Sequence, residues 1–472
     1  MTEVANRFDD VWRVIEKNRN TYIAWLQELC RIPSVAAQSR GMEEAAAAVR
    51  RLLEGLALRQ PVAGSRVQVM PTGGFPVVYG EFPGTADRTL LFYNHYDVQP
   101  EDPLELWQYP PFGAEIHDGV LYARGAADNK GNLVARIAAV HALQEALGAL
   151  PLRVKFLVEG EEEIGSVHLP EFCRRHPDLL AADGCIWEFG YKDADGRLQV
   201  SLGVKGILYV ELVCRGAVQD LHSAQAAIVP NPAWRLVQAL NTLKDAAGRV
   251  LIDGFYDDVE SLTDQDEALL RTMDYDEEAV KRRLEIPEFL NGLTGHDLKR
   301  QLVFSPTCNI CGLTAGYQGE GSKTVLPSVA RAKLDFRLVP RQDPHKIAAQ
   351  LKEHLRKHGY GDIEVAELGL EHAARTGPDA AIVRSVMEMA EKVTGRAPNV
   401  LPSSAGTGPM YEVCQRFGTP AVSVGVGHFA SNNHAPNENI RIDDFIEGIK
   451  LMAAVMLDFA RRKSAPAMSP AG

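Results

Sequence analysis

Several things that the sequence lacks narrow its possible functions. No run of residues approaches the ~18 uninterrupted apolar positions of a membrane-spanning helix, and the N-terminal segment carries early acidic residues where a secretory signal has an apolar core. Basic residues are not in excess, because 50 Lys and Arg stand against 62 Asp and Glu, for a formal net charge of -12. We therefore expect neither a membrane protein nor a nucleic-acid-binding protein.

Paired cysteines and nucleotide-binding loops are also missing. The seven cysteines are scattered and odd in number, which is typical of a protein of the reducing cytoplasm. Cys308 and Cys311 form one Cys-x-x-Cys, but no second pair or neighbouring histidine completes a zinc knuckle, so we expect both thiols to be buried in a strand. No GxGxxG, GKS or GKT segment is present, which argues against a nucleotide binder.

The length of 472 residues exceeds one ordinary core and predicts two domains. Hydrophobic periodicity in the first part of the chain alternates between the helical and the extended pattern. It predicts helices at 5–32, 42–58 and 131–147, and strands at 67–70, 76–79, 89–93 and 152–158. Such alternation predicts an α/β domain built on a mixed or parallel sheet with helices on both faces.

The pattern changes near Val204. Acid-rich helical segments occupy 257–285, and they are followed by expected strands at 302–316 and 328–339 and a helix at 344–358. The second of these strands alternates apolar and polar residues, as an antiparallel strand with one exposed face does. We expect 204–370 to be an inserted α+β domain, 1–203 and 371–472 to form one discontinuous domain, and the tail from Ser464 to be disordered.

The most informative segment that is present reads RVKFLVEGEEEIGS, residues 153–166. A mostly apolar strand delivers Glu159, Glu161, Glu162 and Glu163 at one point. Adjacent carboxylates repel one another, so this cluster indicates a bound cation or a proton-transfer function. A solvated acidic turn is the alternative, and we expect Glu161 to be a solvated neighbour without a chemical role.

Other residues with metal-binding side chains also follow apolar runs. His95 and Asp97 are two positions apart at a strand end, so they share a face and can cooperate. Asp128 lies in a glycine-rich turn before a helix, where capping the helix is the alternative role. Glu188 ends another apolar run, and His434 lies in a polar loop in which His428 competes for any role.

These candidates share a position, because each follows a predicted strand at its carboxyl end, which is where open α/β sheets bind ligands. Carboxylates and imidazoles suit zinc, and a shared aspartate suits two ions ~3.5–4 Å apart. The sequence therefore predicts a two-metal site formed by His95, Asp128, Glu163, Glu188 and His434.

On these residues, the sequence resembles the di-zinc metallopeptidase family that includes carnosinases and related cytosolic dipeptidases, glutamate carboxypeptidase, aminoacylases and succinyl-diaminopimelate desuccinylase. The resemblance covers nearly the whole chain. Seven segments occur in family order: HYDVQP, WQYPPF with DGVLYARGAADNKG, EGEEEIGS, DLHSA, GYQGEGSKTVLPS, DFRLVP and NNHAPNE.

The resemblance implies a role for each candidate. Asp128 bridges two zinc ions, with His95 and Glu188 on one ion and Glu163 and His434 on the other. Asp97 orients the His95 ring, and Glu162 is the general base. The inserted domain is a lid and dimerisation domain, from which His222 reaches across a homodimer to polarise the substrate carbonyl. Arg337, Gly406 and Thr407 contact the substrate carboxylate.

The implied function is metal-dependent hydrolysis of an amide bond in the cytoplasm. The resemblance favours a dipeptidase acting on small peptides with a free C-terminal carboxylate, and an N-acyl-amino-acid amidohydrolase is the alternative. Manganese or cobalt can replace zinc in such a site. A metal-binding scaffold without catalysis is the alternative from another class. For His222 a local hydrogen bond, and for Arg337 a surface ion pair, are the ordinary structural alternatives.

The chain departs from the family pattern at several positions, among them Ala123, where Gly is frequent, and Cys308 and Cys311, where apolar or small residues are usual. Asn129 follows the bridging aspartate, where many relatives have Asp. The loop around Gly406 lacks the Arg-x-Gly-Gly form of carnosinases. Glu188, in place of Asp, is more like the desuccinylase and glutamate carboxypeptidase branches.

Overall fold

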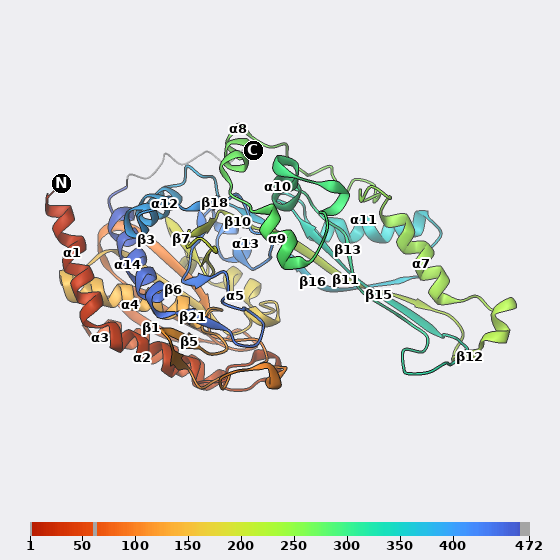
Figure 1. Cartoon of the computed structure of the whole chain (residues 1–472), viewed down its shortest axis with the longest axis horizontal. Coiled ribbons are helices and arrows are strands. Elements are labelled where there is room, and N and C mark those ends of the chain that lie inside the picture. The colour runs from red at the N-terminus through yellow and green to blue at the C-terminus, as the bar shows by residue number, and fades with distance from the viewer. Residues whose placement is uncertain (1, 60–63, 463–472) are drawn as a thin grey trace. The chain divides into compact units, whose positions relative to one another are not determined.

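The computed structural model describes residues 2–59 and 64–462, which form two compact units (Figure 1). The first unit contains the described residues up to Gly203, Arg375–Pro402 and those from Pro409 onward. The second contains Val204–Ala374 and Ser403–Gly408. The loop at 403–408, which the sequence analysis assigns to the first domain, therefore belongs to the second unit. The tail for which disorder is expected lies outside the described residues.

An eight-stranded mixed sheet forms the centre of the first unit, in the order β1-β2-β6-β3-β7-β19-β9-β18. The strands are β1 (Arg66–Met70), β2 (Val77–Phe82), β6 (Leu150–Glu159), β3 (Gly84–His95), β7 (Gly184–Trp187), β19 (Ala421–Ser423), β9 (Gln199–Ser201) and β18 (Asn399–Leu401). β6, β3, β7 and β19 run parallel to one another, so their carboxyl ends share one edge.

Helices cover both faces of this sheet. One layer consists of α3 (Met42–Arg59), α4 (Lys130–Leu147), α14 (Ile442–Phe459) and α12 (Ala381–Thr394), and α1 (Thr2–Lys17) and α2 (Arg19–Cys30) pack against α4. The other face carries α5 (Leu169–Arg175), α6 (Pro177–Leu180) and α13 (Met410–Val413). The predicted α/β class is confirmed.

Two neighbouring pairs of β2 and β6 residues show how the faces divide. Gly80 pairs with Phe156 and leaves room for Leu53 of α3 on one face. The next pair, Glu81 and Lys155, points to the other face. There the Lys155 ammonium donates to the carbonyl oxygens of Asp178 (3.0 Å) and Ala181 (2.8 Å), which anchors α6.

The single helix expected at 5–32 is two helices, α1 and α2, that meet at Asn18. The Asn18 side-chain Nδ2 donates to the carbonyl oxygen of Val14 (3.0 Å), and such local bonds compete with helix continuation. The second helix ends at Cys30, before Pro33, as expected. No helix within the described ranges is long and apolar enough to cross a membrane.

The second unit is built on a four-stranded antiparallel sheet in the order β13-β15-β11-β16. These strands are β13 (Asn309–Ala315), β15 (Val329–Leu338), β11 (Gly206–Arg215) and β16 (Glu364–Glu371). Alternate β15 residues, from Ala330 to Leu338, are buried in a core with α7 (Pro232–Leu243) and α11 (Pro344–Lys357). The intervening residues, among them Asp335 and Arg337, lie on the opposite face, as the alternation predicts.

The strand expected at 302–316 is shorter than predicted. It begins only at Asn309, because the apolar residues before it belong to α10 (Gly295–Phe304), which buries Leu298 and Val303. Pro306 then disfavours continuation of the helix. The acid-rich segment before it forms α8 (Asp264–Thr272) and α9 (Glu277–Leu284).

The expectation that both thiols of the Cys-x-x-Cys are buried is wrong for one of them. Cys308 is buried in the core of the second unit, whereas Cys311 is exposed on β13 and donates to Asp335 Oδ1 (3.2 Å). Residues three apart in an extended chain point to opposite faces, and β13 lies at the edge of the sheet. The two thiols therefore cannot both enter the same core.

Candidate active site

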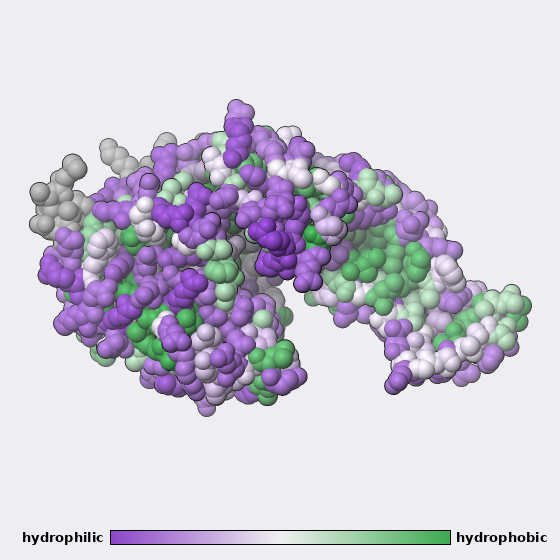
Figure 2. Space-filling model, viewed as in Figure 1, coloured by the Kyte–Doolittle hydropathy of each residue, from purple (hydrophilic) through white to green (hydrophobic). Residues whose placement is uncertain are grey.

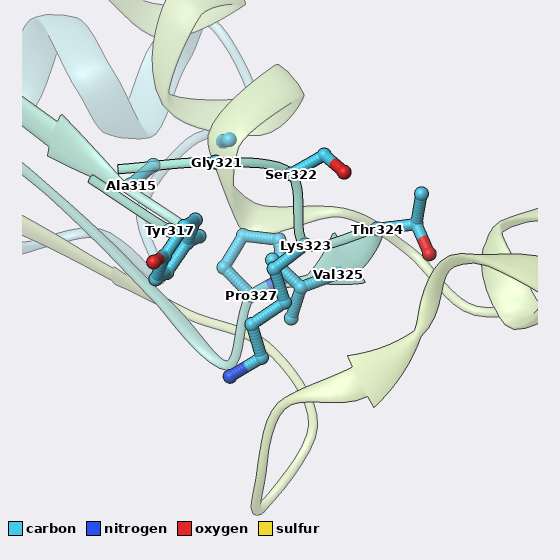
Figure 3. A pocket seen from close by; sticks show the side chains of 10 residues that line it. Ala315, Tyr317, Gly321, Ser322, Lys323, Thr324, Val325 and Pro327 are labelled. Carbon is cyan, nitrogen blue, oxygen red and sulfur yellow. The ribbon is translucent and has the colours of Figure 1, made fainter. Parts of the chain in front are cut away.

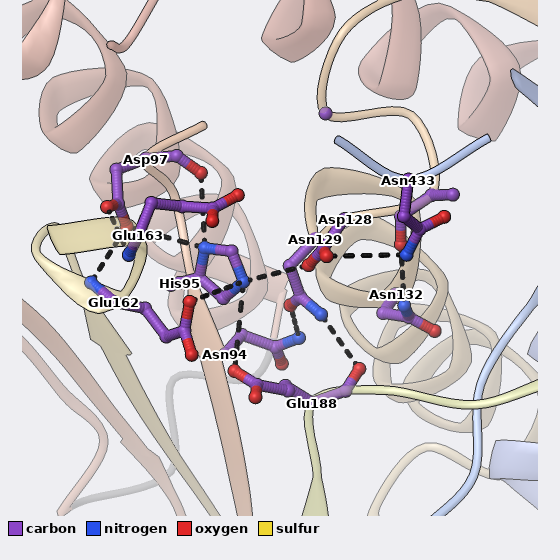
Figure 4. A network of polar contacts seen from close by, with 12 residues as sticks. Asn94, His95, Asp97, Asp128, Asn129, Asn132, Glu162, Glu163, Glu188 and Asn433 are labelled. Carbon is purple, nitrogen blue, oxygen red and sulfur yellow. Dashed lines mark hydrogen bonds and ion pairs between the residues drawn. The ribbon is translucent and has the colours of Figure 1, made fainter. Parts of the chain in front are cut away.

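Three parallel strands bring acidic and imidazole side chains to one edge of the main sheet. His95 is the last residue of β3, Glu162 and Glu163 lie in the short η3 helix (Glu162–Ile164) just after β6, and Glu188 follows β7. β3 lies between the other two strands, so these ends are adjacent. Figure 4 shows His95 among Asp97, Asp128, Glu162 and Glu188.

Two further residues reach the same place from outside this sheet. Asp128 precedes α4 and follows β5 (Val120–Tyr122), which belongs to a separate three-stranded sheet with β4 (Glu115–His117) and β21 (Asn439–Arg441). His434 follows β20 (Gly427–His428), which pairs only with β8 (Tyr191–Lys192) in the described part of the chain. The expectation that all five candidates follow strands at one sheet edge thus holds for only three of them.

The carboxylate of Asp128 lies between the two histidines. Its Oδ1 is 3.1 Å from Nε2 of His95, and its Oδ2 is 3.3 Å from Nε2 of His434. Glu163 Oε2 lies 3.2 Å from the same His434 nitrogen, and Glu188 Oε2 lies 3.7 Å from the His95 nitrogen. Each oxygen of Asp128 therefore faces one imidazole, and each imidazole has one further carboxylate near it. Asp128, Glu163 and His434 bring their ligand atoms within 4.8 Å of one another.

Asp97 sets the orientation of both His95 and the acidic turn. Nδ1 of His95 is 3.1 Å from the carbonyl oxygen of Asp97 and 3.3 Å from its Oδ1. Donation of the Nδ1 proton to these oxygens leaves the Nε2 lone pair for a cation. The Asp97 carboxylate also accepts the backbone N–H groups of Glu162 (3.3 Å) and Glu163 (2.9 Å), which ties the turn to β3.

The electrostatics of this cluster favour positive charge. Hydrogen bonds to Asp128 and Glu163 raise the pKa of His434 to about 10. Burial, together with the charges of Asp128 and Glu163, raises the pKa of Glu188 to about 8. Glu188 Oε2 is buried and has no hydrogen-bond partner among the described residues. A buried carboxylate oxygen without a hydrogen bond, beside imidazole and carboxylate groups that can bind metal, fits a site for divalent cations.

The Glu162 carboxylate makes no hydrogen bond with the other described residues. Its Oε2 is 4.0 Å from His95 Nε2, and its side chain keeps 18% of its surface exposed. Burial, followed by the charge of Glu188, raises its pKa above the ordinary value for glutamate. Such a group is suited to take up and release a proton.

Amide side chains to which the sequence assigned no role surround the cluster. Asn129 Nδ2 donates to the backbone oxygen of Glu188 (2.8 Å), and Asn94 donates to the Asn129 side chain. Asn433 Nδ2 donates to Asp128 Oδ2 (3.3 Å), and Gln99 Nε2 donates to Glu163 Oε2 (2.9 Å). Proximity in the sequence could have identified these amides, because each lies within four residues of a predicted site residue or strand end.

The expectation that Glu161 is solvated is wrong. The residue is 5% exposed, and its carboxylate accepts the backbone N–H of Phe75 (3.2 Å) and lies 2.8 Å from Nδ1 of His168. Glu159 is buried too, with hydrogen bonds from Tyr93 Oη and Ser166 Oγ, and its burial raises its pKa to about 8. The contacts of Glu159 and Glu161 thus hold the turn in place.

His428 has a local structural role. Its Nε2 is 2.8 Å from Asn439 Oδ1, and its Nδ1 accepts the backbone N–H of Ala430 (3.2 Å). Burial lowers its pKa, which favours the neutral ring. His428 thus shapes the loop that leads to His434, and the metal-binding geometry belongs to His434.

The candidates for substrate binding lie in the second unit. Arg337 on β15 donates from its Nη1 to Thr407 Oγ1 (2.7 Å) and from its Nε to Asp335 Oδ2 (3.0 Å). Gly406 accepts the backbone N–H of Lys205 (2.9 Å), which fixes the loop to the start of β11. The structure therefore brings Arg337, Gly406 and Thr407 together, although they lie about 70 residues apart in sequence.

His222 is exposed, and its Nδ1 accepts the backbone N–H of Ala224 (3.1 Å). This bond places the proton of the neutral ring on Nε2. His222 lies in β12 (Leu221–His222), which pairs with β14 (Val325–Leu326). Its partner Val325 lines an open hollow with Tyr317, Lys323 and Thr324 (Figure 3).

Two imidazoles and five carboxylates therefore gather where parallel strands of the main sheet end, and side chains of these kinds suit divalent metal ions. Residues 91–458 match the model of peptidase family M20/M25/M40. The chain therefore belongs to this family, which confirms the resemblance found in the sequence.

Relatives of known structure or activity agree with this assignment. The chain is 30% identical to a Beta-Ala-His dipeptidase of Rattus norvegicus, over 84% of this chain and 82% of the relative. It is 25% identical to a Cys-Gly metallodipeptidase of Schizosaccharomyces pombe, over 96% and 98%. An M20 family metallo-carboxypeptidase from Sulfolobus solfataricus superposes with a TM-score of 0.88 at 43% identity, over 93% of this chain and 99% of that one.

Removal of divalent metal should lower the melting temperature by several degrees, because a ligand present at 100 times its Kd adds about 2.7 kcal/mol. In the metal-free protein, Glu188→Gln should be more stable than the wild type, since one carboxylate leaves a cluster of like charges. With metal restored, the order should reverse. Differential scanning calorimetry with and without chelator measures both effects.

The matched control is Glu81→Gln, which removes a carboxylate that pairs with Arg66 (2.9 Å) and Arg153 (2.7 Å) on the same sheet. Its melting temperature should fall by the same amount with and without metal. A Glu188→Gln protein that responds to the chelator as this control does contradicts the metal site.

Proposed function

We propose that the protein is a metal-dependent dipeptidase that hydrolyses small peptides with a free C-terminal carboxylate. The observation that carries this proposal is the position of Asp128, whose two oxygens face two imidazole–carboxylate pairs while Glu162 stays beside them without a close cationic partner. The dipeptidase relatives support the substrate class.

The site residues suit two divalent ions, for which we propose zinc, with manganese and cobalt as alternatives. His95 and Glu188 would hold one ion, Glu163 and His434 the other, and Asp128 both. Bound there, the ions would supply Lewis acidity and would lower the pKa of a bound water molecule towards ~7. Asp97 acts through His95 by holding its ring in the required tautomer.

Glu162 is the general base in this proposal. Its carboxylate takes a proton from the attacking water while the water oxygen bonds to the scissile carbonyl carbon. As the C–N bond breaks, the same proton passes to the leaving amine nitrogen, which restores the carboxylate. The raised pKa of Glu162 supports this role, because the group must hold the proton between the two steps.

Arg337 and Thr407 are proposed to bind the terminal carboxylate of the substrate. The bonds from Arg337 to Asp335 and Thr407 fix the plane of its guanidinium, and its side chain remains 34% exposed. A fixed guanidinium matches a carboxylate with two parallel hydrogen bonds. The backbone at Gly406 is open to an approaching ligand, since nothing but Ser404 Oγ lies near the position of a side chain there.

His222 is proposed to polarise the substrate carbonyl of the partner subunit in a homodimer. The ring offers an exposed Nε2–H donor, because its Nδ1 is already engaged with Ala224. A hydrogen bond from this donor would stabilise the oxyanion that forms on the carbonyl oxygen. A donor contributed by the second subunit makes the active site depend on dimerisation.

The second unit presents a surface suited to such a dimer. β13 is an edge strand that exposes Ile310 (51%) and Leu313 (52%), and α7 exposes Trp234 (69%). Figure 2 shows apolar surface in this region of the second unit. Exposed apolar edge strands pair with other chains unless they are covered, so a second copy of β13 is the proposed neighbour.

We place the enzyme in a reducing compartment such as the cytoplasm. All seven cysteines carry free thiols, and six of them are buried. An N-acyl-amino-acid amidohydrolase is the alternative activity, since the same site can hydrolyse either amide.

A panel of dipeptides and N-acyl amino acids, assayed with zinc, manganese or cobalt, tests the substrate class. We expect dipeptides to have the higher kcat/KM, and blocking of their C-terminal carboxylate as an amide should raise KM, because Arg337 loses its partner. Faster hydrolysis of N-acyl amino acids would replace the dipeptidase assignment by the alternative.

Glu162→Gln should retain metal and lose nearly all turnover, because the amide cannot accept the proton. General-base catalysis accelerates a reaction by about 100- to 10,000-fold, so kcat should fall by a factor of this size or more. Metal content by elemental analysis and kcat on the best dipeptide measure the two effects. Normal hydrolysis by this variant contradicts the proposed base.

Mixed dimers of Glu162→Gln and His222→Ala subunits test sharing of the site. Each variant alone should be inactive, whereas random exchange should restore about one quarter of the sites, since one site in each mixed dimer then holds both groups. Native mass spectrometry verifies the exchange. Mixed dimers without activity would exclude a contribution of His222 across the interface.

A further inference from the structure

One buried carboxylate lies beside the metal-binding residues without belonging to them. Glu438 is 0% exposed and stands four residues after His434, immediately before β21. Its segment, NNHAPNE, is among those that carry the family resemblance, but neither metal binding nor proton transfer uses this residue.

Four donors surround the Glu438 carboxylate. Oε2 accepts Arg124 Nη1 (2.8 Å) and the backbone N–H of Gly125 (3.0 Å). Oε1 accepts the backbone N–H groups of Ala127 (3.0 Å) and Asp128 (3.0 Å). The loop at 124–128 therefore wraps around a single side chain from a distant part of the chain. A carboxylate is the group that can accept this many donors at once.

The shape of the loop depends on close approach at Gly125. Its φ is +86°, and a Cβ atom there would lie 2.6 Å from Val98 Cγ1. The backbone N–H of Ala123 also donates to the carbonyl oxygen of Glu438 (3.0 Å). Main chain and side chain of Glu438 thus both hold the segment that ends in Asp128.

This contact joins the two loops that reach the site from outside the main sheet. Asp128 ends the wrapped loop, and His434 belongs to the loop that carries Glu438. The pairing of β5 with β21 holds the adjoining segments together, and the Glu438 contact extends this link into the two loops. The distance between Asp128 Oδ2 and His434 Nε2 is 3.3 Å.

We infer that Glu438 is a positioning residue that sets the separation of Asp128 and His434 and so completes the metal-binding cluster. The inference rests on the proposed function for the identity of the ligand, a divalent cation. It assigns to Glu438 no contact with substrate or metal.

An amide at this position cannot replace the carboxylate. The side-chain NH2 group of glutamine would face either two backbone N–H donors or one N–H and Arg124, so two of the four hydrogen bonds would be lost. In the second orientation Arg124, which is 1% exposed, would keep the carbonyl oxygen of Pro100 (3.1 Å) and the Trp107 ring as partners, and in either orientation its charge would lose the carboxylate. The loop would then shift to relieve the unpaired buried charge.

Cobalt(II) titration of the metal-free proteins tests the inference, because visible absorption reports both affinity and coordination geometry without substrate. Glu438→Gln should bind cobalt about 10- to 100-fold more weakly than the wild type, as loss of outer-shell partners does, and its spectrum should change. KM of the cobalt enzyme should stay near the wild-type value while kcat falls.

Glu81→Gln is the matched control, since Glu81 is also a buried carboxylate (9% exposed) with arginine partners in the same unit. It should lose stability and keep the cobalt Kd and spectrum of the wild type. A Glu438→Gln protein that binds cobalt as this control does would overturn the inference.

Glu438→Asp is the second variant, to be used if Glu438→Gln does not fold. It keeps the negative charge that pairs with Arg124, but its side chain is one methylene shorter. Its cobalt Kd should lie between those of the wild type and Glu438→Gln, and a wild-type Kd and spectrum would overturn the inference. Failure of the proposed function gives a different result, namely a wild-type protein that binds cobalt but hydrolyses no peptide.

Discussion

Repulsion among carboxylates gathered at one edge of a sheet is the constraint on which this structure depends. Asp97, Asp128, Glu162, Glu163 and Glu188 converge near two imidazoles, and burial raises the cost of each negative charge. The chain opposes this repulsion with donors of three kinds: histidines beside Asp128, backbone N–H groups on Asp97 and Glu438, and the amides of Asn433 and Gln99. Divalent cations bound there would complete the compensation and would couple folding of this edge to metal binding.

Arg136 holds together the strand ends that carry the cluster. Its guanidinium, on α4, is 1% exposed and donates to the backbone oxygens of Tyr93 (2.6 Å) and Trp187 (2.5 Å) and to Asn94 Oδ1 (2.7 Å). These acceptors immediately precede His95 and Glu188. Although burial lowers its pKa to about 9, the group stays charged at neutral pH and places a positive charge beneath the acidic edge. The hydrogen bonds of Arg136 therefore both attach α4 to the sheet and fix the strand ends that carry the site.

Apolar runs in the sequence predicted the site residues that directly follow strands of the central sheet. His95, Glu163 and Glu188 follow apolar runs that are strands of the central sheet, and parallel pairing places their ends together. Asp128 and His434 reach the cluster through contacts between loops about 300 residues apart, among them the bonds of Glu438 to Arg124 and the Asp128 loop. No periodicity reports such a pair. The residue types placed both side chains in the predicted site, and the family resemblance alone implied which side chains share a metal ion. Cys311 and the helix at 295–304 were misjudged because short apolar runs do not distinguish a strand from an amphipathic helix or an edge position.

The three consecutive glutamates show how one turn separates chemical roles. Glu161 turns back to His168 and the Phe75 N–H, whereas Glu163 faces His434 and Gln99. Asp97 accepts the N–H groups of Glu162 and Glu163, so the turn cannot rotate without breaking the contact that also orients His95. Glu162 is then the one carboxylate of the three that points toward the cluster without a strong partner. Burial, followed by the charge of Glu188, raises its pKa, which supports the proton-transfer role that we propose for it.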